Sequence, residues 1–178
     1  MNSDTRNVID EFKGLSEAEI IAKLDSSDSG LEIAIENLER DFNMGTIVRS
    51  ANAFGVRTVH VIGRRQWNKR GAMATDKYLH VHYYQTVDEF IEEMKQRNKQ
   101  VIAVDNVFGA KKLSAIDLPR QSVLVFGAEN SGISKDLLQK SYEIVEIEQH
   151  GSTRSINVGV AAGIVMYRWL QQHSKGMQ

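Results

Sequence analysis

The chain has 178 residues, 42% of them apolar and 25% charged, so it is long enough for one ordinary folded domain, and its composition excludes a disordered chain. It has no cysteine, which excludes disulfide scaffolds, thiolate nucleophiles and cysteine-ligated zinc. The net charge of −1 hides an uneven distribution: residues 1–41 carry eleven acidic and four basic side chains, a net −7, which leaves +6 on the remainder. A near-neutral total therefore does not exclude nucleic acid, whose binding depends on local clusters of cations.

The first thirty residues are predicted to form an acidic helical extension, ahead of one domain in residues 31–178. A short helical pattern covers residues 4–12, and Ser16 and Glu19 form a capping box that opens a second helix. This region lacks the apolar core of a signal peptide, and no apolar run of the chain approaches the ~20 residues that span a bilayer. We therefore expect a cytoplasmic protein with no membrane partner.

From residue 31 onwards, apolar runs typical of buried strands alternate with helical patterns. The predicted strands are residues 31–35, 58–63, 81–84, 100–105, 122–127 and 144–148, and the predicted helices are residues 44–54, 87–97, 134–140 and 156–172. Gly55 stands where a glycine that ends a helix belongs. This alternation predicts an α/β fold with a mostly parallel sheet, helices on both faces, and ligands at the carboxyl ends of the strands. It does not give the strand order.

The predicted loop after the second strand is strongly basic. Within residues 63–71, four cations surround a tryptophan and no acidic residue is present: Arg64, Arg65, Trp67, Lys69 and Arg70. Alone, this pattern is as typical of a solvated loop as of an RNA-binding loop. In the second case the arginines would hold phosphate oxygens and Trp67 would stack on a base.

Three further polar segments follow predicted strands, and each is ambiguous alone. In the first, Asn43 is placed to cap the following helix, and Arg49 lies either in solvent or at the edge of the buried face, where it would hold a phosphate. In the second, residues 126–133, two glycines flank Glu129; this is either a turn or a ligand loop. The third, residues 150–163, is a serine-rich cap before a helix of small residues. The five histidines lack ligand spacing, so we expect no metal site.

Together, these three segments resemble the three motifs of the SpoU/TrmH-type branch of the SPOUT RNA methyltransferases. Residues 43–51 (Asn-x-Gly-x-Ile-x-Arg-Ser-Ala) resemble motif one, residues 124–133 (Leu-Val-Phe-Gly-x-Glu-x-x-Gly-Ile) motif two, and residues 151–158 (Gly-x-x-x-Ser-Ile-Asn-Val) motif three. The order and the spacing fit, and the resemblance covers roughly residues 31–172.

The resemblance implies a fold and an activity. The fold would contain a deep C-terminal trefoil knot, in which S-adenosylmethionine binds in a bent form. The activity would be transfer of the methyl group of this cofactor to a ribose 2′-hydroxyl of tRNA or rRNA. It would be carried out without a metal, by a homodimer. Our own hypothesis is that the small-residue helix 156–166 is a packing surface of this dimer. Nothing in the sequence selects between the two RNA classes.

The resemblance also assigns roles to individual residues. Arg49 would be the catalytic residue, as a cation that holds the target phosphate and the developing alkoxide. The other catalytic-site residues would be Asn43, Glu129, Ser155 and Asn157. The cofactor would contact Gly127, Gly132, Ile147, Gln149 and Ile156, largely through the backbone, and RNA would contact the basic loop.

The chain departs from the family pattern just before motif three. The typical Ile-Pro-Met-x-Gly reads Ile-Glu-Gln-His-Gly in residues 147–151. We therefore expect a carboxylate, that of Glu148, in the loop that lines the cofactor pocket. This departure keeps open a second hypothesis, an RNA-binding homodimer of the same fold without cofactor binding or catalysis. A third, an unrelated nucleotide-binding α/β domain, is disfavoured because the phosphate-binding fingerprint is absent.

Overall fold

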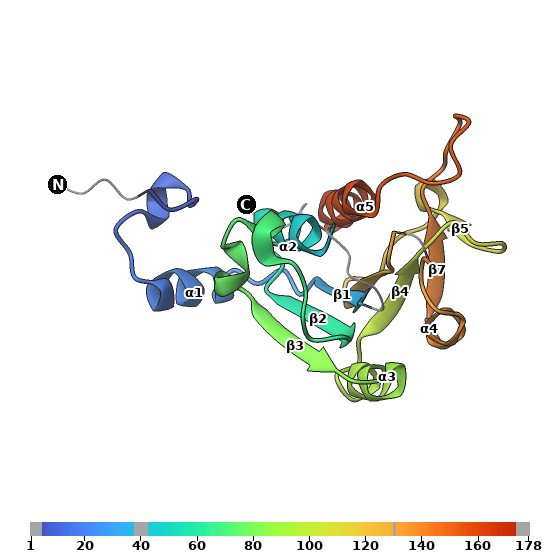
Figure 1. Ribbon diagram of the computed structural model, residues 1–178, viewed down its shortest axis with the longest axis horizontal. Helices are drawn as coiled ribbons and strands as arrows, with labels where there is room; N and C mark the ends of the chain where they lie inside the picture. Colours follow the sequence, from blue (N-terminus) through green and yellow to red (C-terminus); the bar gives the residue numbers. More distant parts are fainter. Residues whose placement is uncertain (1–4, 38–42, 130, 174–178) are drawn as a thin grey trace.

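A parallel β-sheet forms the centre of the molecule in the computed structural model, which describes residues 5–37, 43–129 and 131–173 (Figure 1). Within these residues the strands are β1 (Glu32–Asn37), β2 (Thr58–Gly63), β3 (His80–Tyr84), β4 (Gln100–Val104), β5 (Lys111–Lys112), β6 (Ser122–Phe126) and β7 (Glu143–Glu146). Their order in the sheet is β3-β2-β1-β6-β4-β7-β5, and each neighbouring pair is parallel. The predicted α/β class with a mostly parallel sheet is confirmed.

Helices cover both faces of the sheet, as predicted. The α-helices are α1 (Glu17–Asp25), α2 (Asn43–Ala53), α3 (Val87–Gln96), α4 (Lys135–Lys140) and α5 (Val158–His173). One buried cluster joins α2 and α5 to one face of the sheet, and a second joins α3 and α4 to the other face. Because both faces are covered, the strands carry almost continuous apolar runs, which is why the sequence revealed them.

From residue 31 onwards the sequence predictions fit the observed elements closely, with two differences at the C-terminal half. The helix predicted for residues 4–12 is wrong: residues 5–12 contain only a short 3-10 turn at Asp10–Phe12, none of whose side chains is buried. Strand β5 was not predicted because it consists of two exposed lysines, which carry no apolar signal. Helix α5 begins at Val158 rather than at residue 156, because Asn157 Oδ1 accepts hydrogen bonds from the backbone N–H groups of Gly159 (2.9 Å) and Val160 (3.3 Å). Residue 4 of the first predicted helix and residues 174–178 of the predicted domain lie outside the described residues.

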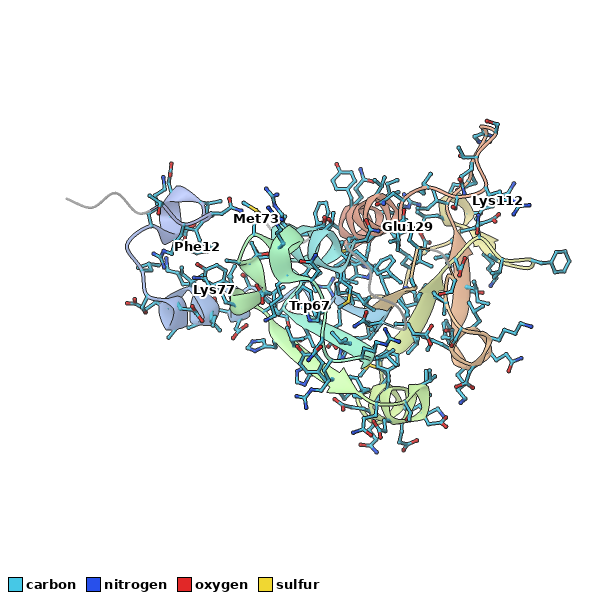
Figure 2. All side chains as sticks on the ribbon, in the orientation of Figure 1. Phe12, Trp67, Met73, Lys77, Lys112 and Glu129 are labelled. Atoms are coloured by element: carbon cyan, nitrogen blue, oxygen red, sulfur yellow. The ribbon has the colours of Figure 1, made fainter. Side chains whose placement is uncertain are left out.

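The acidic N-terminal extension is anchored to the domain through α1. The predicted capping box is confirmed: Ser16 caps α1, and the Glu19 carboxylate accepts a hydrogen bond from the Ser16 backbone N–H at 2.7 Å. At the other end of α1, Asp25 accepts from Arg57 Nε at 2.8 Å, and the Arg57 side chain is 3% exposed. Lys77 lies beside α1 at the edge of the domain, where its Nζ is 3.6 Å from Glu17 (Figure 2). The extension therefore has a fixed point of attachment, although its short helical turn at Asp10–Phe12 lies away from the sheet (Figure 1).

The strand order places a reversal point between β1 and β6. From β1 the chain builds outwards through β2 to β3, whereas β6, β4, β7 and β5 lie on the other side. Ligands of open parallel sheets bind at such a reversal, outside the carboxyl ends of the strands. This is where the three polar segments of the sequence meet.

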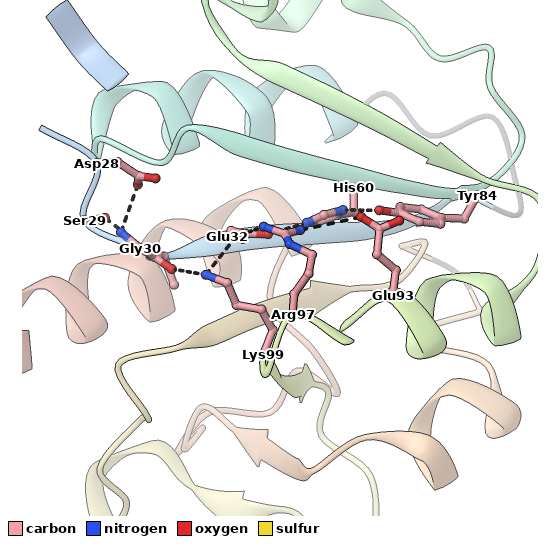
Figure 3. Close-up of polar contacts among 10 residues, drawn as sticks. Asp28, Ser29, Gly30, Glu32, His60, Tyr84, Glu93, Arg97 and Lys99 are labelled. Carbon is pink, nitrogen blue, oxygen red and sulfur yellow. Dashed lines mark hydrogen bonds and ion pairs between the residues drawn. The ribbon is translucent and has the colours of Figure 1, made fainter. Parts of the chain in front are cut away.

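A buried ionic network fastens α3 and the chain after it to the sheet (Figure 3). The Glu32 side chain is 7% exposed, and its carboxylate lies 2.6 Å from His60 Nε2, 2.8 Å from Lys99 Nζ and 2.5 Å from Arg97 Nη2. The other nitrogen of His60 lies 3.0 Å from the Tyr84 hydroxyl. Burial acts to raise the pKa of Glu32, but the hydrogen bonds from His60 and Lys99 outweigh it and lower that pKa to about 2.

We expect Glu32→Ala to lower the free energy of unfolding by about 3 kcal/mol, because it leaves buried cationic and polar groups without their acceptor. Glu92→Ala, which removes an exposed carboxylate from α3, is the matched control and is expected to change that free energy by less than ~0.5 kcal/mol. Urea denaturation followed by circular dichroism measures both values.

The same network makes stability depend on pH. The pKa of Glu32 is lower in the folded chain (about 2) than its ordinary value of 4.5, so its contribution is complete above pH 4.5 and is lost as the pH falls towards 2. The difference in stability between the wild-type chain and Glu32→Ala should therefore shrink over this range. A difference that stays constant from pH 6 to pH 3 would contradict this account of Glu32.

Candidate functional site

Three side chains from the three polar segments are joined by hydrogen bonds. Asn43 Nδ2 donates to Glu129 Oε2 at 2.6 Å. Asn157 Nδ2 donates to Asn43 Oδ1 at 2.9 Å and to Glu129 Oε1 at 3.3 Å. These residues are 28 to 114 positions apart in the sequence, so the fold brings them together. We call Asn43, Glu129 and Asn157 the polar triad.

Each member of the polar triad stands at an end of an element, where the backbone fixes its position. Asn43 opens α2, Glu129 follows β6, and Asn157 caps α5. Figure 2 shows Glu129 close to the start of α5. The triad therefore locks the start of α2 and the start of α5 to the carboxyl end of the central strand β6.

Close backbone packing at two glycines supports this arrangement. A Cβ added to Gly45 would lie 2.7 Å from the backbone nitrogen of Ala72 and 2.8 Å from Cα of Gly71, so α2 is in direct contact with the end of the basic loop. A Cβ on Gly159 of α5 would lie 3.0 Å from the Thr46 side chain of α2. Small residues at these positions let the two helices and the loop approach one another.

A cavity of about 760 Å³ opens beside the polar triad. Its walls include every residue predicted to contact the cofactor, namely Gly127, Gly132, Ile147, Gln149 and Ile156. Two residues predicted for the catalytic site, Glu129 and Ser155, line it as well. The structure thus brings seven of the predicted residues to one cavity, which is of the size that small-molecule ligands occupy.

A tight turn at Gly127 and Gly132 forms part of the wall of this cavity. Gly127 and Gly132 pack so closely that a Cβ on Gly127 would lie 2.2 Å from the carbonyl carbon of Gly132. Asp105 fixes the turn, because its Oδ2 accepts a hydrogen bond from the Ile133 backbone N–H at 2.9 Å. Asp105 was not among the residues predicted for the site, although its position directly after a buried strand could have indicated a role there.

A second residue that the sequence analysis missed joins the two loops at the mouth of the cavity. Asn106 Nδ2 donates to the backbone carbonyl of Arg154 at 2.5 Å, and both residues line the cavity. This bond ties the loop after β4 to the loop before α5.

Glu148 and Gln149, the two residues that stand in place of Pro-Met, point in different directions. The Glu148 carboxylate accepts a hydrogen bond from the Ser114 hydroxyl, which lowers the pKa of Glu148, and Glu148 does not line the cavity. The expectation that the Glu148 carboxylate lies in the pocket wall is therefore wrong. Gln149 does line the cavity, and its Oε1 is buried without a hydrogen-bond partner among the described residues.

Arg49 is exposed on α2 and does not line the cavity. It lies three residues beyond Thr46 and so shares a helix face with it. Because the Thr46 side chain lies against Gly159, this face of α2 is the one turned towards the start of α5. Of the two positions that the sequence left open for Arg49, exposure to solvent is the one observed.

The basic loop is held at the carboxyl end of β1. Asn37, which is 2% exposed, donates from Nδ2 to the backbone carbonyls of Arg64 (2.6 Å) and Gln66 (3.2 Å). Trp67 is partly buried against the core, and Lys69 Nζ lies 5.5 Å from the centre of its ring. Stacking of Trp67 on a base would require its ring to leave this contact.

The cations of the loop differ in their surroundings. Lys69 forms an ion pair with Asp76 at 2.7 Å, and the Arg65 guanidinium lies 4.8 Å from the ring centre of Tyr83. Arg64 and Arg70 are exposed. The loop therefore presents arginines to solvent beside α2, while Lys69 is already paired.

Neither a metal centre nor a membrane span is found in the part of the chain that the structure describes. No group of three or more histidine, aspartate or glutamate side chains is placed to hold a metal ion in residues 5–37, 43–129 and 131–173. Over the same ranges, no helix has the length and apolar character needed to cross a bilayer.

A comparison with family models decides the relationship that the motifs suggested. The model described as the SpoU rRNA Methylase family matches residues 30–167. The chain belongs to this family. The match contains all three motif segments and the whole of the cavity wall.

Curated relatives of this SpoU family member are similar over most of its length. It is 25% identical over 145 residues to the tRNA (guanosine(18)-2′-O)-methyltransferase of Escherichia coli K12, an alignment that covers 80% of this chain and 63% of that protein. It is 31% identical over 147 residues to an uncharacterized tRNA/rRNA methyltransferase of Mycobacterium avium, covering 79% of this chain and 47% of that protein. The chain thus spans less than two thirds of the length of either relative.

Solved structures share the fold. The crystal structure of the A. aeolicus TrmH/SpoU tRNA modifying enzyme superposes with a TM-score of 0.78 at 22% identity, over 90% of this chain and 86% of that chain. An AdoMet-bound rRNA methyltransferase from Sinorhizobium meliloti superposes with a TM-score of 0.71 at 23% identity, over 79% and 56% of the two chains.

We expect Gly127→Ala to lower the free energy of unfolding by about 1–3 kcal/mol, because the added methyl group overlaps the backbone of Gly132 and forces the turn open. Gly151→Ala is the matched control, since a Cβ there meets nothing within 4 Å. Thermal and urea unfolding of the two variants measure the difference, and equal stabilities would contradict the packing described for this turn.

Proposed function

We propose that the protein transfers the methyl group of S-adenosylmethionine to the 2′-hydroxyl of a ribose in tRNA or rRNA. The observation that carries this proposal is the polar triad, which joins the three family motifs beside one cavity. The names of the relatives, tRNA 2′-O-methyltransferases and an AdoMet-bound rRNA methyltransferase, agree with it.

The cavity fits this cofactor in size and in chemistry. Ile147 and Ile156 give it apolar surface, the tight turn at Gly127 and Gly132 brings backbone close to it, and the buried Gln149 oxygen lacks a donor. These five residues would hold the cofactor. When bound, its sulfonium supplies an activated methyl group, so the work left to the protein is alignment and activation of the hydroxyl.

Arg49 acts on the RNA rather than on the cofactor. A guanidinium keeps its proton throughout the ordinary pH range, so Arg49 serves as a cation that holds the target phosphate and stabilises the developing alkoxide. The hydroxyl would lose its proton to solvent as its oxygen takes the methyl group, with S-adenosylhomocysteine as the leaving group. The polar triad and Ser155 position the chain segments around the reacting groups. They hold α2, which carries Arg49, at a fixed position relative to the cavity.

The basic loop binds the RNA backbone. Arg64, Arg65 and Arg70 point into solvent next to α2 and suit contacts with phosphate oxygens. Lys69 contributes less because it is paired with Asp76, and Trp67 fixes the loop on the core. The direct backbone contact between Gly45 and Gly71 places this surface beside the helix that carries Arg49.

A homodimer is the proposed active unit. Val160, Ile164 and Tyr167 are 55%, 40% and 53% exposed, and their spacing aligns them as one apolar stripe along α5. Phe54 extends the stripe onto the end of α2, with its ring centre 6.2 Å from that of Tyr167. A second copy of the chain would cover this stripe.

The family's trefoil knot, the two-part organisation and the cytoplasmic location belong to the same proposal. Strand β7 lies between β4 and β5, which are joined directly by residues 105–110, and the chain after β7 would pass through that loop. A crystallographic trace with residues 147–157 outside the loop would contradict the knot.

In the same proposal, residues 1–30 form the extension and residues 31–178 form the methyltransferase domain. The domain works without a metal, in the cytoplasm.

The activity is tested by incubating the purified protein with methyl-labelled S-adenosylmethionine and separated tRNA and rRNA pools. We expect label in one pool and 2′-O-methylation at the mapped position.

We also expect Arg49→Lys to lower kcat at least tenfold with RNA affinity unchanged, because lysine keeps the charge and loses the two-pronged guanidinium. Calorimetry with S-adenosylhomocysteine is the companion measurement. A chain that binds RNA but gives no heat of binding with this ligand would be an RNA-binding protein rather than the proposed enzyme.

Replacing Arg64, Arg65 and Arg70 together with alanine should weaken RNA binding and lower the slope of log affinity against log salt by roughly 1 for each phosphate that is no longer neutralised. Lys69→Ala is the matched control, since Lys69 is already paired, and should leave the slope nearly unchanged. Filter binding at several salt concentrations measures both. An unchanged slope in the triple variant would mean that the loop is only solvated.

We expect Ile164→Asp to convert the dimer to a monomer, because the apolar stripe on α5 would then bury a charge. Sedimentation equilibrium measures the mass of both proteins. A wild-type chain that remains monomeric at micromolar concentration would overturn the proposed dimer.

A further inference from the structure

The amide of Gln149 is the most unusual polar group in the cavity. Its Oε1 is buried and has no hydrogen-bond donor among the described residues, although it belongs to a side chain that lines the cavity. A buried acceptor without a partner is destabilising, and such groups in folded proteins are usually satisfied by protein, water or ligand. Once the side chain turns Oε1 from its buried position into the cavity, a donor on the bound ligand would remove this cost.

The position of Gln149 is fixed from both sides of its loop. Its neighbour Glu148 is bonded away from the cavity to Ser114, and further along, the carbonyl of Arg154 is held by Asn106. The typical family residue at position 149 is methionine, which cannot accept a strong hydrogen bond. Glutamine here therefore adds a directional acceptor at a place where the family pattern has an apolar side chain.

The cavity that Gln149 lines has an apolar part, which favours a flat apolar ligand group. Ile144, Ile147, Ile156 and Leu138 line the same cavity. An isolated charge would be costly to bury among such side chains, whereas an aromatic ring with one polar edge would bury well.

S-adenosylmethionine offers three kinds of hydrogen-bond donor: an ammonium, ribose hydroxyls and the amino group of adenine. The ammonium suits a carboxylate, and Asp105 and Glu129 line the same cavity. The hydroxyls are attached to a polar ring. The adenine amino group is the donor that an apolar ring carries, and the amide of glutamine is a well-suited partner for that edge of adenine.

We propose that Gln149 reads the adenine ring of the cofactor, with its Oε1 accepting a hydrogen bond from the exocyclic amino group. Gln149 is thus a specificity residue that selects an adenosine-containing cofactor. This inference rests on the proposed function, because it requires S-adenosylmethionine in the cavity.

The test compares two ligands that differ at this one position. S-adenosylhomocysteine carries the amino group, whereas its purine-riboside analogue carries a hydrogen atom there and offers Oε1 no donor. Isothermal titration calorimetry on the full chain should give at least tenfold tighter binding of the adenosine compound. In Gln149→Met the ratio should fall to about threefold or less, since the methionine side chain cannot accept a strong hydrogen bond from the amino group.

Gln139→Met is the matched control, because Gln139 lines the same cavity but is exposed, and it should keep the wild-type ratio. Thermal unfolding verifies that each variant is folded. A Gln149→Met ratio equal to that of the wild type would overturn the proposal and leave the proposed function intact. Failure of the wild-type chain to bind S-adenosylhomocysteine at all would instead overturn the proposed function.

Discussion

The site depends on one small set of hydrogen bonds, those among Asn43, Glu129 and Asn157. Each of these side chains ends or begins an element, so a bond between two of them fixes the relative position of two whole elements. The carboxylate of Glu129 is the shared partner, because it accepts a hydrogen bond from each of the two asparagines. The start of α2, the turn at Gly127 and Gly132 and the start of α5 are in this way given one geometry.

Polar side chains at the carboxyl end of β1 extend the same logic to the surrounding loops. Glu36 and Asn37 are each 2% exposed and point to opposite faces of the sheet. Glu36 accepts from the backbone N–H of Ser134, at the start of α4, and Asn37 holds the basic loop through Arg64. Both buried groups are satisfied by backbone atoms of connecting segments, so β1 positions loops on both sides of the sheet.

Most of the fold could be read from the sequence because the strands are buried on both faces and their apolar runs are nearly continuous. Gly55 ends α2 with φ of +73°, as its place in the pattern predicted. The motif residues were found by resemblance, whereas Asp105 and Asn106 were not, since a lone polar pair after a strand has no period. The strand order and the outward turn of Glu148 depend on contacts between distant segments, which no local pattern encodes.

The place of β6 in the sheet has a consequence for how the protein is made. Strand β1 needs β6 as its inner neighbour, yet about ninety residues separate Ile33 from its partner Leu124. During synthesis the first half of the chain can pair β1, β2 and β3 but must leave the inner edge of β1 bare until β6 has left the ribosome. That unpaired apolar edge is the segment most exposed to aggregation, and the long-range pairing that closes it is expected to make folding slow.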